Sequence, residues 1–368
     1  MKAISLIFIL FACLLFSHIV NADNEREFFW EKNNAEIIET GDLKWKPEPF
    51  IFLQGKSNRY IDFENGNDNN DGLSQNTAWK HHPWDPNANG KAKESSGIHT
   101  YIFKRGVFYR GQLLPKESGD KNNPIRLTSS PEWGDGEASI VGSELIKNWE
   151  KNCKNKLIPN PENVWTTTLN FTPRCLWTID EKGNVKRIPL ARTPNWKVDN
   201  FDDIKSQWWI WTNPKKPFDN FYQDKSGKQF NMGIDTEHIK GDPNYFKGAL
   251  VWSEYGWVMG TPFPSKIIAV DTQNSAIAFG GQWSSAPGTT KIIRNCRYYL
   301  EDKPQYLDDP EGEFWFEKAG SGGILYLRSP QNHDPNKLHI EAAKYLNLID
   351  AENLNNIEIS GLSFKFTN

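Results

Sequence analysis

The feature of this sequence that most constrains its fold is a series of short apolar segments separated by Gly, Asn, Asp and Pro. Apolar and polar residues alternate within them, and β-branched and aromatic residues are common, as is typical of β-strands. No amphipathic helical pattern of ten residues or more lies between them. A strand this short cannot bury a face alone, whereas a stack of such strands can, so the pattern favours a β-solenoid. We expect strands at 60–63, 101–103, 107–109, 125–127, 138–141, 357–359 and 362–366.

A cluster rich in Asn, Asp and Gly at 65–72 follows the first expected strand. These residues tolerate left-handed backbone angles and form side-chain turns, so the cluster predicts a tight surface turn. Ser74 is expected to cap a short helical turn that leads to Trp79. Asp68 and Asp71 offer oxygen ligands for a structural calcium ion, but the loop lacks the bidentate Glu of an EF-hand. A bound calcium ion is therefore the alternative to a plain turn, and no other cofactor or metal is expected.

The N-terminus has the three parts of a secretory signal peptide. Lys2 supplies a positive charge, residues 3–20 are almost wholly apolar, and a small-residue cleavage site ends at Ala22. We therefore predict a signal peptide at 1–22 and a secreted protein, extracellular or periplasmic, with no membrane attachment after cleavage. An uncleaved N-terminal anchor and lipidation at Cys13 are the alternatives.

Charge and cysteine content argue against two broad classes of protein. The formal net charge is −3 and no basic stripe stands out, so a nucleic-acid partner is not expected. Signal cleavage leaves Cys153, Cys175 and Cys296, too few for a disulfide scaffold, so the core must come from packing. One bridge and one thiol would fit this number, and the sequence leaves the pairing open.

Aromatic content is the part of the composition that bears on function. Sixteen tryptophans occur together with many Asn and Gly residues. Flat aromatic faces suit the apolar faces of pyranose rings, while amides and carboxylates suit sugar hydroxyls, so the composition favours carbohydrate binding. The alternative is that most of the tryptophans belong to the core of a β-rich protein.

The most sugar-like stretch contains three tryptophans within four residues, Trp208, Trp209 and Trp211. In a strand Trp209 and Trp211 would share one face and Trp208 would lie on the other, so at most two would contact one ligand. Glu254, which lies between two tryptophans, is the fourth substrate-binding candidate. The same four residues would be equally suited to a β-rich core.

Three other polar clusters are predicted to be structural. The adjacent His81 and His82 cannot both face one direction on a strand, which disfavours a shared metal site. The carboxylates at 308–313 crowd a turn that leads into an expected strand at 314–316. Arg110 is expected to pair with a carboxylate.

Several stretches resemble one group of proteins. They are "YIDFENGNDNNDGLSQNTAW", "TYIFKRGVFYRG", "NPIRLTS", "ASIVGSELIKNW", "RYYLEDKPQYLDDPEGEFWFEKAGSGGILYLRSP" and "NNIEISGLSFKFTN". Together they resemble the N-terminal portion of secreted right-handed parallel β-helix carbohydrate-active enzymes, chiefly β-helical glycoside hydrolases of the fucosidase/xylosidase type. The resemblance covers roughly 60–150 and 294–368, and "HHPWD" at 81–85 departs from it.

The resemblance implies an all-β fold with an interruption. A leader at 23–59 would precede the cap and first rungs of a right-handed parallel β-helix at 60–149. An inserted β-rich subdomain would occupy 150–341, and the β-helix would resume at 342–368. Enzymes of this type continue for many more rungs, so we expect the resumed part to be truncated.

The function that the resemblance implies is glycoside hydrolysis of a plant or algal polysaccharide. A polysaccharide lyase on the same fold and a non-catalytic carbohydrate-binding or adhesion solenoid are the alternatives. The partner is expected to be a polysaccharide or oligosaccharide, and the protein a monomer. Catalytic residues are unassigned and expected beyond Asn368, so residues 23–368 alone are expected to be inactive. Hydrolysis needs two carboxyl groups at the scissile bond, and neither they nor the substrate can be assigned from this sequence.

Overall fold

The computed structural model describes residues 35–45, 50–195, 208–212, 221–255, 258–280, 292 and 294–367. The predicted signal peptide lies outside these residues. The chain divides into two compact units, Met1–Ile51 and Phe52–Asn368. The described part of the first unit is an antiparallel pair of strands, β1 (Ala35–Ile37) and β2 (Leu43–Trp45).

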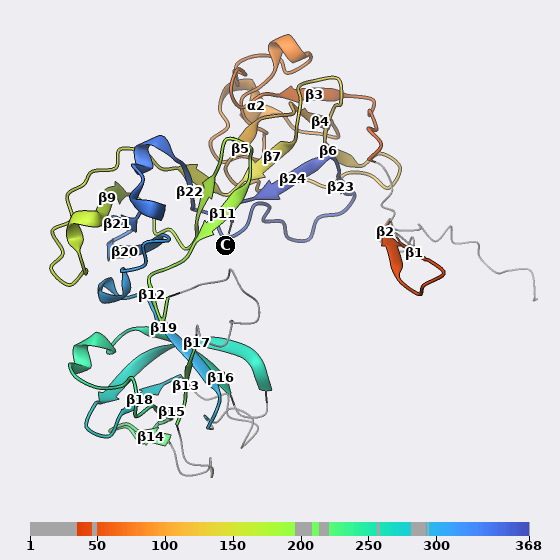
Figure 1. Cartoon of the computed structure of the whole chain (residues 1–368). Coiled ribbons are helices and arrows are strands. Elements are labelled where there is room, and N and C mark those ends of the chain that lie inside the picture. The colour runs from red at the N-terminus through yellow and green to blue at the C-terminus, as the bar shows by residue number, and fades with distance from the viewer. Residues whose placement is uncertain are drawn as a thin grey trace, which may run out of the picture. The chain divides into compact units, whose positions relative to one another are not determined.

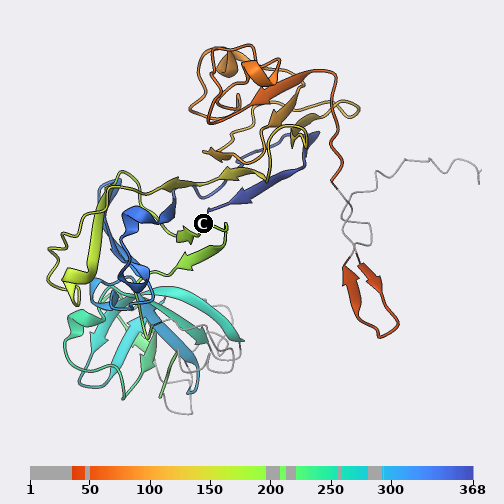
Figure 2. The same cartoon turned by 45° about the horizontal axis from the view of Figure 1, so that its top comes forward.

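The second unit contains two small parallel sheets, ordered β23-β6-β4-β3 and β24-β7-β5 (Figures 1 and 2). Their strands come from the two ends of this unit, so that β23 and β24 add to strands formed more than 200 residues earlier. The bounds are β3 (Asn58–Ile61), β4 (Thr100–Phe103), β5 (Phe108–Arg110), β6 (Ile125–Ser129), β7 (Ala138–Val141), β23 (Ile357–Ile359) and β24 (Leu362–Lys365).

These parallel strands confirm the expected short strands, with small shifts at the ends. The first strand ends at Ile61 instead of residue 63 because the Asp62 carboxylate accepts the backbone N–H groups of Glu64 and Asn65, which turns the chain. β24 ends at Lys365 because Phe366 has a left-handed φ of 57°. The corner between β23 and β24 is made by Gly361 at a φ of 63°, as the position of that glycine predicts.

The central parallel strands β4 and β7 are buried on both faces, which explains their nearly continuous apolar character. On β4, Tyr101 and Phe103 contribute to one apolar cluster, and Ile102 contributes to another beside Trp133. Trp84 packs in the first cluster and is 2% exposed. The core of this region is thus rich in aromatic rings.

Two antiparallel sheets follow, ordered β11-β10-β22-β8 and β20-β21-β9. They share one core that includes Leu176, Phe314 and Leu327. The strand expected at 314–316 lies within β20, directly after Gly312. The bounds are β8 (Ser143–Leu145), β9 (Val164–Leu169), β10 (Leu176–Ile179), β11 (Val185–Ile188), β20 (Glu313–Ala319), β21 (Gly322–Arg328) and β22 (His339–Ala343).

The largest sheet is antiparallel, ordered β12-β19-β16-β17-β18-β15-β14, and β13 also pairs with β19. Its core centres on Trp211, whose ring stacks on Tyr298 with centroids 3.5 Å apart. The bounds are β12 (Arg192–Thr193), β13 (Trp209–Ile210), β14 (Phe221–Gln223), β15 (Gln229–Ile234), β16 (Leu250–Tyr255), β17 (Val258–Asp271), β18 (Ala276–Phe279) and β19 (Arg297–Glu301).

Helical structure in the described residues is short, so the protein is mostly β. Ser74 caps the first 3₁₀ turn with a reciprocal capping box to Thr77, which confirms the predicted cap. No helix in the part of the chain that the structure describes is long and apolar enough to span a membrane. The helical bounds are Gln75–Thr77, α2 (Gly90–Glu94), Pro161–Asn163, Pro243–Tyr245, Pro304–Tyr306, Pro330–Asn332 and Pro335–Lys337.

A buried ion pair joins the parallel strands to the antiparallel ones. Arg110 on β5 donates two hydrogen bonds of 2.7 Å to the carboxylate of Glu341 on β22, which has no exposed surface. The Ser143 hydroxyl donates a third bond to the same carboxylate. The expected pairing of Arg110 with a carboxylate is thereby confirmed.

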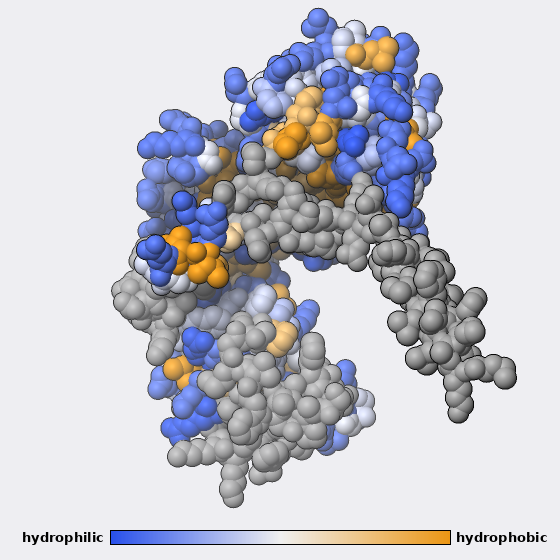
Figure 3. Space-filling view, turned by 90° about the vertical axis from the view of Figure 1, so that its right-hand side faces the viewer, coloured by the Kyte–Doolittle hydropathy of each residue, from blue (hydrophilic) through white to orange (hydrophobic). Residues whose placement is uncertain are grey.

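The face of the molecule in Figure 3 is mainly hydrophilic, with small apolar patches between the polar side chains. Exposed large apolar side chains occur at the C-terminal strands, where Ile359 is 42% exposed and Phe364 is 43% exposed. In the described residues β23 and β24 each pair with one strand, β6 and β7 respectively.

Candidate functional site

The candidate site is built on the antiparallel pair β16–β19. Trp252 lies directly opposite Tyr299, and Leu250 lies opposite Glu301. Successive side chains of a strand point to opposite faces, so these four residues share the face turned away from the core. The residues between them are completely buried: Val251, Ser253, Tyr298 and Leu300.

A hydrogen bond fixes the two aromatic rings relative to a carboxylate. The indole N–H of Trp252 donates to the carboxylate of Glu301 over 2.5 Å. The rings of Trp252 and Tyr299 are nearly parallel, with an interplanar angle of 10° and centroids 5.9 Å apart. Two flat faces and an acceptor for hydroxyl groups therefore lie side by side on one sheet.

Arg192 adds a fixed positive charge to this arrangement. It lies opposite Glu301 in the β12–β19 pair, and its guanidinium carbon is 3.6 Å from the centre of the Tyr299 ring. Its Nε–H donates to the carbonyl of Pro194 over 2.9 Å, and its backbone N–H donates to Glu313. Arg192 is 3% exposed, so its side chain is held by packing as well as by these bonds.

A cleft of about 850 Å³ opens over this face. Trp252, Tyr299 and the carboxylate of Glu301 line it on one side, and Phe316 of β20 lines it on another. Its volume lies within the usual range of small-molecule sites. The charged side chains that line it are Arg174, Arg187, Arg192, Glu301, Asp302 and Lys318.

The two carboxylates of the cleft are neighbours in sequence. Consecutive side chains of a regular strand point to opposite faces, but Asp302 follows the end of β19 with a left-handed φ of 68°. Both Glu301 and Asp302 therefore line the same cleft. Partial burial raises the pKa of the Glu301 carboxyl, while the indole N–H of Trp252 and the charge of Arg192 act in the opposite direction. Perturbed carboxyl groups in a cleft are common at functional sites.

The three predicted tryptophans lie on both faces of the large sheet, as strand alternation predicts. Trp208 packs edge-on against Tyr299, with ring centroids 4.9 Å apart, and so lies beside the floor of the cleft. Trp209 stacks on His238 and contacts Tyr298 on the other side of β19. Trp211 is completely buried, and its indole N–H donates to the Ser253 hydroxyl in the core.

Glu254 is held by an ion pair instead of being presented at the surface. It is 1% exposed and lies at an irregularity of the β16–β17 pairing. Its carboxylate accepts the backbone N–H of Arg297 over 2.8 Å and also the guanidinium of that residue. Arg297 in turn lies over the ring of Trp208 at 5.5 Å. Glu254 therefore fixes Arg297, which contacts Trp208 beside the cleft, and is not itself presented to a ligand.

Trp252, Tyr299, Glu301 and Arg192 were not among the residues predicted to bind substrate. The signal that could have found three of them is the alternation in "LVWSEY" and "RYYLE". It puts Trp252 on one face of its own strand, and Tyr299 together with Glu301 on one face of theirs. Pairing between the two segments cannot be read from either one alone. Arg192 carries no local signal, because its partner in the sheet is 109 residues away along the chain.

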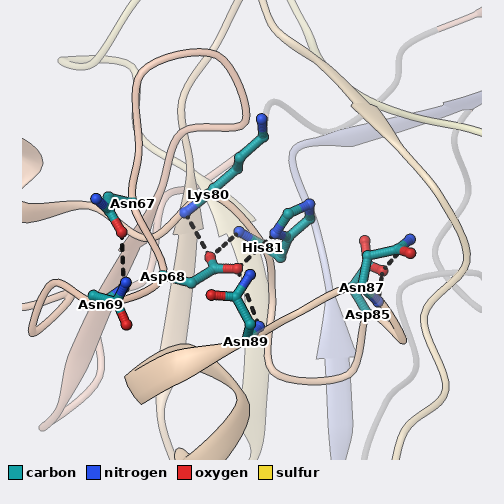
Figure 4. A network of polar contacts seen from close by, with 8 residues as sticks. All are labelled: Asn67, Asp68, Asn69, Lys80, His81, Asp85, Asn87 and Asn89. Carbon is teal, nitrogen blue, oxygen red and sulfur yellow. Dashed lines mark hydrogen bonds and ion pairs between the residues drawn. The ribbon is translucent and has the colours of Figure 1, made fainter.

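The carboxylates of the Asn- and Asp-rich loop hold it to the segment that follows, and Figure 4 shows the bonds of Asp68. Asp68 accepts the backbone N–H groups of Lys80, His81 and Asn89 and also the Nδ1–H of the His81 ring. The Asp71 carboxylate accepts the Thr77 hydroxyl over 2.6 Å. These bonds link the loop at 65–72 to residues 77–89. The described residues contain no group of three or more His, Cys, Asp or Glu side chains placed to hold a metal.

His81 and His82 point in different directions. His82 is 2% exposed, its Nδ1 accepts the backbone N–H of Trp84, and its ring packs on Tyr101. The cavity beside His82 and Asp85 has a volume of about 20 Å³, which fits one water molecule but not a sugar. In the same part of the molecule Asp85 accepts two bonds from Asn87 (Figure 4).

The cysteines add no covalent links to this framework. No disulfide joins Cys153, Cys175 and Cys296, all of which lie in the described residues. Cys175 lines the cleft, where it accepts a 3.5 Å contact from the guanidinium of Arg187.

Comparison with known proteins gives little further information. The chain matches no protein-family model, and no curated protein is similar to it in sequence. A solved structure described as the complex structure of XylC with xylose is similar with a TM-score of 0.34 and 14% sequence identity. The match covers 82% of this chain and 34% of that chain, so this chain spans about a third of its length.

Proposed function

We propose that this chain binds a polysaccharide in the cleft over β16 and β19. The observation that carries the proposal is the arrangement of two flat rings, Trp252 and Tyr299, beside the fixed carboxylate of Glu301 and the fixed guanidinium of Arg192. All four residues line one cleft of about 850 Å³.

The chemistry of these groups matches that of a sugar ring. The C–H bonds on one face of a pyranose pack against an aromatic ring, and its hydroxyls donate to carboxylates and accept from guanidinium groups. Because Trp252 already donates its indole N–H to Glu301, the orientation of its ring is set before a ligand arrives. Pre-organised groups lose less conformational entropy on binding.

The wider proposal is that this is part of a secreted, polysaccharide-degrading protein of the right-handed parallel β-helix type. Its support is the stacking of strands β3, β4, β6 and β23 in parallel, with β5, β7 and β24 in a second parallel stack. Each stack gains one strand at a time from successive passages of the chain, as rungs of a solenoid do. Secretion rests on the signal-like sequence at 1–22.

Glycoside hydrolysis in this cleft is a second candidate function. It is favoured by the presence of Glu301 and Asp302 in the same cleft, since hydrolysis uses one protonated carboxyl group and one ionised one. Burial raises the pKa of both carboxyl groups, so either one is suited to the role of the acid. The alternatives are a lyase, which would leave unsaturated uronates, and binding without turnover.

The binding proposal is tested by affinity electrophoresis of residues 23–368 through gels that contain soluble plant or algal polysaccharides. We expect retardation by at least one polymer, and Trp252→Ala should weaken that binding by about tenfold. Trp45→Ala is the matched control, because Trp45 is 71% exposed and belongs to the other compact unit. No retardation by any polymer, or equal loss in both variants, would overturn the proposal.

The hydrolysis candidate is tested by incubating the same protein with the polymer that it binds. New reducing ends that disappear in Glu301→Gln and in Asp302→Asn would support hydrolysis in this cleft. Products that absorb in the ultraviolet would instead indicate a lyase. Binding without any product contradicts both reactions and leaves the polysaccharide-binding function.

A further inference from the structure

The charges that line the cleft differ in sign from the charge of the whole chain. The chain has a formal net charge of −3. The cleft is lined by the four cationic side chains Arg174, Arg187, Arg192 and Lys318 and by the two carboxylates Glu301 and Asp302. A concave site with an excess of one sign focuses its field on the ligand, so the cleft attracts anions although the chain as a whole does not.

The paired charges of the cleft are on its floor. Glu301 lies next to Arg192 in the sheet and also accepts the indole N–H of Trp252, so its negative charge is already compensated. The other charged groups that line the cleft are three cations and the carboxylate of Asp302, so cations are in excess. Arg174, Arg187 and Lys318 are exposed, and none of them forms an ion pair with a carboxylate of the described residues.

The positions of these cations are set by the strands that carry them. Arg187 lies on β11, and Lys318 lies on β20, and both of these strands border the cleft. Arg174 lies just before β10. Arg187 lines the same cleft as Tyr299 and Glu301. The three cations therefore line the same cleft as the rings on which a sugar would stack.

We propose that the cleft selects a polysaccharide built from uronic acids. This inference rests on the proposed polysaccharide-binding function and names its ligand class. A uronate carries its carboxylate on the pyranose ring itself, so one residue can stack on Trp252 or Tyr299 while its carboxylate pairs with Arg174 or Arg187. Guanidinium groups bind carboxylates through two parallel hydrogen bonds, which makes them selective for this group over a neutral hydroxymethyl.

The test compares two ligands that differ in charge and not in ring structure. Isothermal titration calorimetry is carried out on residues 23–368 with a short oligogalacturonide and with its fully methyl-esterified form. We expect the acid to bind at least about tenfold more tightly than the ester at low ionic strength. Added salt should reduce this ratio, because exposed charges are screened.

The double variant Arg174→Gln/Arg187→Gln should bring the ratio of acid to ester affinity close to one. Its matched control is Lys93→Gln/Lys121→Gln, which removes two exposed positive charges that do not line the cleft and should leave the ratio unchanged. Thermal unfolding of each variant shows whether the fold is retained. A sulfated oligosaccharide is titrated in parallel to separate carboxylate recognition from general anion binding.

The outcomes separate the two proposals. Equal binding of acid and ester, or a ratio that the double variant and its control reduce alike, would overturn the uronate inference while polysaccharide binding stands. Tighter binding of the sulfated oligosaccharide than of the uronate would overturn the uronate inference and would indicate that the cleft selects sulfated sugars instead. Failure of the acid, the ester and every polymer of the electrophoresis panel to bind would overturn the polysaccharide-binding function as well.

Discussion

The parallel strands and the large antiparallel sheet use aromatic side chains in opposite ways. In the central parallel strands β4 and β7 both faces are buried, so rings such as Tyr101, and Trp84 of the adjoining turn, are core residues. In the antiparallel pair β16–β19 only one face is buried, so Trp252 and Tyr299 meet charged groups at a cleft. The difference shows that abundant tryptophan does not by itself indicate a sugar site. What decides the role of a ring is whether its strand has one covered face or two.

The two regions also satisfy their polar atoms differently. The buried ring atoms His82 Nε2, Trp84 Nε1 and the Tyr101 hydroxyl have no hydrogen-bond partner among the described residues. At the cleft, by contrast, the indole N–H of Trp252 donates to the carboxylate of Glu301. The aromatic core of the parallel strands thus relies on packing, whereas the cleft relies on bonds and charges.

The largest expected effect is the loss of packing in the parallel strands. Trp84→Ala should lower the free energy of unfolding by about 3–5 kcal/mol, because it leaves a large cavity and removes no hydrogen bond of the indole. Urea unfolding measures the loss, and Trp84→Phe, which keeps part of the volume, should cost less. Saccharide affinity of the folded protein should not change. A loss below about 1 kcal/mol would show that this region is not a packed core.

The second prediction concerns the fixed cation of the cleft. Arg192→Lys keeps the charge but removes the guanidinium that stacks on Tyr299 and the Nε–H that donates to Pro194, so the protein should lose about 2 kcal/mol of stability. Saccharide affinity should fall by about tenfold. Arg105→Lys is the control in the parallel region, where Nε–H also donates to a carbonyl, that of Gly136, but at a more exposed position. Equal effects of the two substitutions would contradict a special role for Arg192.

The third prediction uses pH to separate the regions. Burial holds the pKa of His82 well below its usual value of 6.5, so the folded protein resists protonation that the unfolded chain accepts. Stability is therefore retained above about pH 6.5 and falls as the pH drops below it, by at most about 1.4 kcal/mol per pH unit. In His82→Gln the free energy of unfolding should depend less steeply on pH from about pH 7 to about pH 5.

Asp85 acts in the opposite direction near the same cavity. Burial raises the pKa of its carboxyl, so its contribution to stability declines as the pH rises through that value. The comparison of His82→Gln with the unsubstituted protein isolates the histidine, because Asp85 is present in both. An unchanged slope in His82→Gln would show that His82 is not the group that titrates.

The smallest expected effect belongs to the carboxylate of the cleft. Glu301→Gln keeps an oxygen that can accept the Trp252 N–H and removes a partly desolvated charge, so stability should change by less than about 1 kcal/mol. Urea unfolding of the variant measures the change. A much larger loss would mean that Glu301 is a structural partner of Arg192 before it is part of a binding site.

The sequence predicts local structure well where turns are specified by their own residues. The short strands, the Ser74 cap and the glycine corner at Gly361 all follow from nearby side chains. The register that joins β24 to β7 does not, because it pairs residues more than 200 positions apart. Local pattern therefore predicts a mostly β chain of short strands but not which strands are neighbours.

The same limit explains what could be predicted of the site. Trp208 was a candidate and lies against the floor of the cleft, whereas Trp211 has the same local character and is completely buried. Strand alternation separates the two faces but does not say which face is covered. Asp302 lines the cleft because its backbone is left-handed, and an Asp residue alone does not predict that conformation. The cleft forms only when strands far apart in the sequence pair, so local sequence patterns do not predict it.

The antiparallel pairing of β8 with β22 has a consequence for how the sequence between these two strands could diverge in evolution. Leu145 lies opposite Glu341, so the chain leaves and returns at one place, as it would in a simple hairpin. Loop-closure entropy grows only with the logarithm of length, by about 0.6 kcal/mol for each doubling. Bodies of very different size could therefore be grafted between these two strands at little thermodynamic expense. The residues that line the cleft all fall between β8 and β22 in the sequence, so ligand preference could diverge while the parallel strands stay the same.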